Sequence, residues 1–248
     1  MKSNLLNTLI LAALVVPSVA MAAETSPISA SVSMTTDYIF RGISQSSKGP
    51  AMQGGFDYAH ASGLYVGTWG SSVGWIKDFQ GYKSGSMEFD LYAGFRSGFE
   101  GTDVTYDLGA AQYMYPGNRP AAITNADTTE VYGALGWKWI TAKYSRVASS
   151  GAYGFANASG SDYMDLAASV PLGETGLTAG AHWGTFKFKN NTLQNYTDTK
   201  FSLSYDIGSG LSAGIAYTNT DAKVANWSDA NAKNLGAGKG FAWITKAF

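Results

Sequence analysis

The chain contains 248 residues, with 17 basic and 18 acidic side chains, a formal net charge of −1 and no cysteine. The lack of cysteine excludes a disulfide framework and thiolate chemistry, and the balanced charge disfavours nucleic-acid binding, because no basic excess is present to neutralise phosphates. The 30 glycines, 6 prolines and 14% aromatic residues are typical of a fold built from many short strands.

Residues 1–22 have the features of a secretory signal peptide. Lys2 precedes an apolar segment over residues 5–16, and a site of small residues ends at Ala22. We therefore expect one mature domain over residues 23–248. After the signal peptide, no segment approaches the roughly 20 apolar residues of a membrane helix, so any membrane insertion has to use strands.

Residues 28–42 alternate between an apolar and a polar face with a period of two residues. Met34, Tyr38 and Phe40 lie on the apolar side, whereas Arg41 lies on the polar side. This pattern predicts a strand that ends in an aromatic pair, as a membrane-spanning strand does at the level of the lipid headgroups.

The same alternation recurs along the chain, and we expect about twelve strands in all. The further predicted strands cover residues 52–58, 64–69, 87–96, 104–115, 130–138, 140–144, 163–172, 177–183, 200–207, 211–218 and 241–248. The long polar loops lie near residues 43–51, 73–85, 116–127, 148–160, 187–196 and 220–238, and they alternate with tight turns. The register of residues 64–72 stays open, because either Leu64 and Val66 or Tyr65 and Trp69 could face lipid.

An even number of strands, joined alternately by tight turns and long loops, predicts an all-β fold: a transmembrane antiparallel up-and-down β-barrel. The termini and the tight turns would then face the periplasm. The chain ends on Phe248, as outer-membrane barrels recognised by the assembly machinery commonly do, although Lys246 stands where that signal usually has an apolar residue. The competing interpretation is a soluble lipocalin-like barrel, which would turn its apolar face inward.

Five segments carry a resemblance to a known family. They are residues 36–46 (TDYIFRGISQS), 50–58 (PAMQGGFDY), 62–69 (SGLYVGTW), 88–94 (EFDLYAG) and 245–248 (TKAF). These segments resemble the TorF porin family, also catalogued as a family of conserved hypothetical proteins, and residues 71–73 (SSV) depart from the SNV expected there. The resemblance implies an outer-membrane location in a Gram-negative bacterium and a pore activity. It implies no catalytic residue and no known solute.

Charged side chains on the polar faces are the candidate functional residues. We expect Arg41, Glu88 and Asp90 to share one level across the lumen near its outer end, where opposed charges would set a transverse field that selects solutes. The predicted lumen-lining or constriction residues are Arg41, Asp57, Glu88, Asp90, Arg96, Asp107, Lys143, Asp165 and Lys200. Alternatively, these charges only solvate and cross-link a polar interior, as they would in a barrel that does not conduct.

His182 could belong to a Ser/His/Asp site of an outer-membrane lipase, because Asp165 and Ser169 are expected close to it across a hairpin. A lipid-cleaving site would have to open towards lipid, whereas these side chains face the lumen, so we expect no enzyme. No spacing of histidines and carboxylates predicts a metal site, and residues 236–240 lack the pattern of a phosphate-binding loop. We therefore expect no cofactor.

The sequence thus predicts a porin-like outer-membrane channel for passive diffusion of small polar solutes or ions. The alternative is a closed outer-membrane barrel that acts through its extracellular loops as a receptor, adhesin or structural protein. The expected partners are outer-membrane lipid, small polar solutes and, through Phe248, the barrel-assembly machinery. No nucleic acid is expected.

Overall fold

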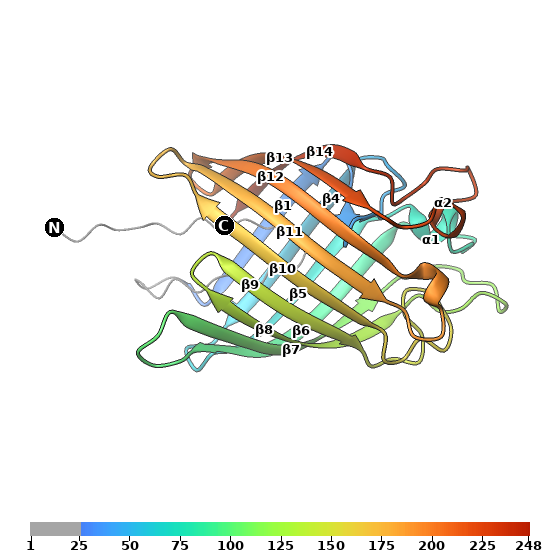
Figure 1. The fold of residues 1–248 in the computed structure, drawn as a ribbon, viewed down its shortest axis with the longest axis horizontal. Coiled ribbons are helices and arrows are strands. Elements are labelled where there is room, and N and C mark those ends of the chain that lie inside the picture. The colour runs from blue at the N-terminus through green and yellow to red at the C-terminus, as the bar shows by residue number, and fades with distance from the viewer. Residues whose placement is uncertain (1–25) are drawn as a thin grey trace.

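The computed structural model describes residues 26–248, so the predicted signal peptide lies outside the described residues. Within this range, twelve strands close into an antiparallel barrel (Figure 1), which confirms the predicted fold. Consecutive wall strands pair with each other, and β1 pairs with β14 to close the ring. The wall strands are β1 (Ile28–Thr35), β4 (Ala51–Ala59), β5 (Leu64–Ser72), β6 (Met87–Gly98), β7 (Val104–Met114), β8 (Thr128–Trp137), β9 (Ile140–Val147), β10 (Asp162–Pro171), β11 (Leu177–Lys187), β12 (Tyr196–Gly208), β13 (Leu211–Thr220) and β14 (Lys239–Ala247).

The apolar face of the wall strands points outward. On β1, Met34 is 55% exposed, whereas the adjacent Thr35 is only 7% exposed. The register that the sequence leaves open on β5 follows the same rule, since Leu64 and Val66 are exposed and Tyr65 is buried. Alternation along each strand therefore separates an apolar exterior from a polar interior. This orientation excludes the lipocalin-like arrangement, which would need the apolar face inside.

The connections differ in length between the two ends of the barrel. Ser209 and Gly210 join β12 to β13, and both have positive φ, as a two-residue type I′ hairpin requires. The long loops at the other end carry the short helices α1 (Trp75–Asp78), η1 (Thr192–Gln194) and α2 (Val224–Trp227). In Figure 1, α1 and α2 lie at the end opposite the C-terminus. No helix within residues 26–248 is long and apolar enough to span a bilayer.

The predicted strand over residues 28–42 is wrong in its second half. The wall strand ends at Thr35, and the chain then forms a small separate hairpin from β2 (Ile39–Phe40) and β3 (Ile43–Ser44). Arg41 and Gly42 make its two-residue turn, with φ values of 47° and 78°. Because this hairpin lies inside the barrel, residues 39–44 are called the inward hairpin below.

The aromatic pair of this segment does not lie at the membrane interface. Tyr38 and Phe40 are buried, with exposures of 3% and 7%. A hairpin has the same two-residue period as a wall strand, so the alternation of the sequence continues across the point where the chain leaves the wall. Both rings lie inside the barrel because the chain leaves the wall after Thr35, before it reaches Tyr38.

Candidate functional site

Arg41, at the tip of the inward hairpin, forms a two-point ion pair with Glu130 on β8. Both nitrogen-to-oxygen distances are 2.7 Å, and the two side chains are 8% and 2% exposed. The guanidinium also lies 4.3 Å from the ring centroid of Tyr163 and 5.0 Å from that of Phe186. Paired charges in fork geometry, supported by aromatic rings, can stay ionised away from water.

Tyr153, from the loop between β9 and β10, completes the shell around Glu130. Its hydroxyl donates a hydrogen bond of 3.0 Å to the Glu130 carboxylate. Burial, and then the charge of Glu130, raise the pKa of the Tyr153 phenol well above its usual value. The phenol therefore remains a neutral donor to the carboxylate.

The tip of the inward hairpin reaches across the lumen. β8, which carries Glu130, lies on the far side of the ring from β1. A Cβ atom placed on Gly42 would lie 2.5 Å from the Cβ of Asp198 on β12 and 2.5 Å from the Cγ2 of Thr220 on β13. At the tip, Arg41 thus reaches β8, whereas Gly42 packs directly on β12 and β13, where only glycine fits.

Asp37 fixes the base of the inward hairpin, and its side chain is fully buried. Its carboxylate accepts hydrogen bonds from Ser44 at 2.6 Å and from Ser46 at 2.9 Å. Lys239 on β14 forms an ion pair with it at 2.8 Å. Contacts at its base and at its tip therefore fix the inward hairpin inside the barrel.

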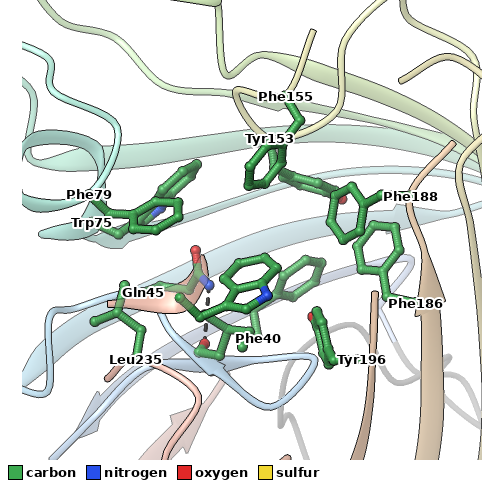
Figure 2. Close-up of a pocket in the computed structure, with 12 residues that line it drawn as sticks. Phe40, Gln45, Trp75, Phe79, Tyr153, Phe155, Phe186, Phe188, Tyr196 and Leu235 are labelled. Carbon is green, nitrogen blue, oxygen red and sulfur yellow. Dashed lines mark hydrogen bonds between the residues drawn. The ribbon is translucent and has the colours of Figure 1, made fainter. Parts of the chain in front are cut away.

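Aromatic side chains from several outer loops pack over the inward hairpin, and Figure 2 shows them facing a common space. Phe79 and Trp227 are stacked, with ring centroids 5.8 Å apart, and Trp75 meets Tyr115 edge to face at 5.0 Å. Side chains of the inward hairpin, β11 and β12, together with Gln45 and Leu235, line the same cavity. The full lining, called the aromatic cap below, is Phe40, Ile43, Gln45, Trp75, Phe79, Tyr153, Phe155, Phe186, Phe188, Tyr196, Trp227 and Leu235. The cavity among them measures about 30 Å³, room for roughly two water molecules. The space among these side chains is therefore nearly filled.

A larger cavity of about 150 Å³, called the polar cavity below for the charged side chains in its lining, lies beneath the inward hairpin, against the wall from β9 to β13. By the same measure it has room for roughly ten water molecules. Its charged lining residues are Arg41, Lys143, Asp165, His182, Asp198 and Lys200. Three of the predicted residues, Arg41, Lys143 and Asp165, are thus brought together with a fourth, Lys200, at one cavity.

His182 lies between two carboxylates at this cavity. Its Nδ1 is 3.0 Å from Asp165 and its Nε2 is 2.8 Å from Asp198. The predicted proximity of His182 to Asp165 is confirmed, and Asp198 is an additional partner that also accepts a hydrogen bond from Tyr163 at 2.8 Å. Since both ring nitrogens face carboxylate oxygens, neither is available as a base for the hydroxyl of Ser169.

Glu88 and Asp90 lie on β6, away from this cavity. Both side chains are almost completely buried, and Tyr38 donates a hydrogen bond of 3.4 Å to Glu88. Arg41 has Glu130 as its carboxylate partner, and within residues 26–248 it forms no ion pair with Glu88 or Asp90. That the three side chains share one level across the lumen stays a prediction.

The remaining predicted residues are held by tyrosines on the wall from β4 to β8. Tyr92 donates to Asp57 at 2.6 Å, and Tyr65 donates to Asp107 at 2.6 Å. The Arg96 guanidinium lies 4.0 Å from the ring centroid of Tyr65. The two hydrogen bonds link β4 to β6 and β5 to β7, and the Arg96 contact links β5 to β6. Such cross-links are the structural role expected of these charges in a barrel that does not conduct.

Glu130, Asp198 and the buried tyrosines are not among the residues that the sequence predicts to line the lumen. The alternation of the predicted strand over residues 130–138 places Glu130 on its polar face, so its inward direction was visible. The same alternation does not identify the partner of Glu130, because Arg41 lies 89 positions earlier and on a loop. The pairing depends on how that loop folds inside the closed barrel.

A closed antiparallel barrel with an apolar exterior, a charged interior and a loop folded inside it has the porin fold. Two solved structures are similar: the KdgM porin, with 8% identity over 89% of this chain and 99% of that chain, and the NanC porin, with 11% identity over 89% and 98%. The TM-score is 0.54 for each, and at such low sequence identity the likeness concerns the fold alone. The chain belongs to a bacterial family of unknown function (Gcw_chp), whose profile matches residues 20–248. No curated protein matches it.

Proposed function

We propose that this protein is an outer-membrane channel of the porin class, related to the TorF porins, for passive diffusion of small polar solutes or ions. The observation that carries the proposal is the polar cavity of about 150 Å³, lined by charged side chains, inside a barrel with an apolar exterior. A charge-lined lumen discriminates solutes by charge and size. The inward hairpin forms the constriction above this cavity.

The apolar exterior supports a location in the outer membrane of a Gram-negative bacterium, with lipid as the surrounding partner. Outward side chains at the middle of β12 and β13, such as Phe201 and Ile215, are 63% and 62% exposed, which would be costly in water. Phe248 is 73% exposed at the C-terminus, where the barrel-assembly machinery would recognise it.

The two faces of β12 offer a direct test of the membrane location. Phe201→Arg places a charge on the outward face near the strand's middle, and we expect it to reduce the stability of the refolded barrel in lipid vesicles by about 2–4 kcal/mol. Ser202→Arg adds the same side chain at the next position, which lines the lumen, and should cost much less. Urea titrations in vesicles measure both, and equal losses would contradict the membrane assignment.

The channel itself is tested by conductance in planar bilayers. Refolded protein, with folding established by heat-dependent mobility on gels, should give small discrete conductance steps, because the inward hairpin and the aromatic cap narrow the lumen. Reversal potentials in a salt gradient then measure the preference for cations or anions. Folded protein that gives no conductance would remove the channel proposal.

A second candidate function is supported by the aromatic cap, whose side chains leave only a small cavity among them. In this case the barrel is closed and acts through its outer loops as a receptor, adhesin or structural protein. Loop deletions would then abolish binding of the partner while solute uptake stayed unchanged. Conductance that depends on the inward hairpin would argue against this candidate.

A further inference from the structure

Two lysines at the polar cavity differ from its other cations. Arg41 forms an ion pair with Glu130, and His182 pairs with two carboxylates. Within residues 26–248, by contrast, neither Lys143 nor Lys200 has a side-chain hydrogen bond or ion pair with another residue. Both side chains are half-buried and line the cavity. Ammonium groups held away from bulk water need anionic or hydrogen-bonding partners.

The strand register explains why these lysines lack a protein partner. Lys143 is opposite Asp165 between β9 and β10, but Asp165 is engaged by His182, and the Lys143 ammonium lies 3.8 Å from the ring centroid of Tyr132. Lys200 is opposite His182 between β11 and β12, so its direct neighbour is itself a donor. The carboxylates at the cavity that could neutralise the lysines, Asp165 and Asp198, already pair with His182.

The charge balance around the cavity favours an anion. The ion pair of Arg41 with Glu130 is neutral. His182 donates to Asp165 and Asp198 from both ring nitrogens, which leaves this group with one negative charge. Lys143 and Lys200 carry two positive charges, so the cavity as a whole retains one positive charge. A bound oxyanion would neutralise it and accept hydrogen bonds from both ammonium groups.

The remaining lining leaves room for such a ligand. The wall beside the lysines is made of small side chains, with Ala167, Ala168, Gly180 and Ala181 from β10 and β11. Hydroxyl groups of Thr141 and Ser202 are among the other lining groups. This is a space for a compact anion with polar atoms on several sides.

We propose that Lys143 and Lys200 form a binding subsite for small oxyanions, either organic carboxylates or phosphate, in the lumen beneath the inward hairpin. The proposal deepens the channel function and rests on it for access of the solute to the lumen. A carboxylate or phosphate oxygen accepts hydrogen bonds from both lysines, while Arg41 and His182 stay paired within the protein. The subsite makes the channel selective for anions.

The test uses the refolded protein in detergent, with calorimetric titrations of succinate, inorganic phosphate and the neutral analogue succinamide. The unchanged protein should bind succinate or phosphate and not succinamide. The double variant Lys143→Gln/Lys200→Gln should bind the anion about tenfold or more weakly, because it loses two charged donors. Lys143→Arg/Lys200→Arg should retain binding, and Lys223→Gln, at an exposed loop lysine, is the matched control that should change nothing.

Binding of succinate alone or phosphate alone supports the subsite and identifies which oxyanion it takes. Equal affinities of the unchanged protein and the double glutamine variant overturn it. Bilayer conductance of the same preparations separates this result from the channel proposal. Channels that conduct but show no lysine-dependent affinity refute the subsite only, whereas lysine-dependent binding in protein that does not conduct refutes the channel only. Heat-dependent gel mobility verifies that each variant is folded.

Discussion

Replacing Arg41 with glutamine is expected to lower the free energy of unfolding by about 3–5 kcal/mol and to raise the conductance of the channel. The substitution leaves the Glu130 carboxylate buried without its partner cation and removes the ring contacts of the guanidinium. The tip of the inward hairpin then loses its attachment to the far wall. Urea titration measures the stability, and planar-bilayer recording measures the conductance.

The double variant Arg41→Gln/Glu130→Gln is the control for this prediction. It removes both charges, so its stability should lie above the value expected from adding the two single losses. Arg41→Glu, which places two carboxylates together, should also shift the preference between cations and anions. Unchanged stability, conductance and selectivity in the Arg41 variants would show that the ion pair does not hold the hairpin.

Gly42→Ala is expected to displace the tip of the inward hairpin and so to open the lumen. A methyl group at this position would lie 2.5 Å from atoms of Asp198 and Thr220, too close for the tip to remain seated. The positive φ of 78° adds roughly 1–2 kcal/mol of backbone strain for a residue other than glycine. We expect a larger conductance, and cleavage by trypsin after the newly accessible Arg41.

Gly101 provides a matched control for this substitution. Its φ of 73° is close to that of Gly42, but a Cβ atom added there would meet nothing within 4 Å. Gly101→Ala should therefore cause the backbone strain alone and leave conductance and trypsin cleavage unchanged. If the two alanine variants behave alike, contact of the tip with β12 and β13 does not position the hairpin.

Much of the wall could be predicted from the sequence, because alternation with a period of two residues acts locally. Met34 and Thr35 are assigned to opposite faces by their neighbours alone, and the exposed fractions agree. The tight turns also depend on local residues, as Ser209 and Gly210 show. The number of strands and the two ends of the barrel follow from these local signals.

The interior could not be predicted in the same way. Phe40 belongs to a hairpin inside the barrel, yet its sequence pattern is that of a wall strand. Glu130 and Asp198 acquire their partners, Arg41 and His182, only when distant strands are brought together by closure of the ring. The aromatic cap likewise depends on how several loops pack together, and no local periodicity records that packing.

The ion pair between Asp37 and Lys239 links the placement of the inward hairpin to the closure of the barrel. Lys239 belongs to β14, the last strand of the chain, and β14 also pairs with β1 to close the ring. Contacts between residues so far apart in sequence form late in folding, because the intervening chain has to be ordered first. The base of the hairpin is therefore secured in the same event that seals the barrel.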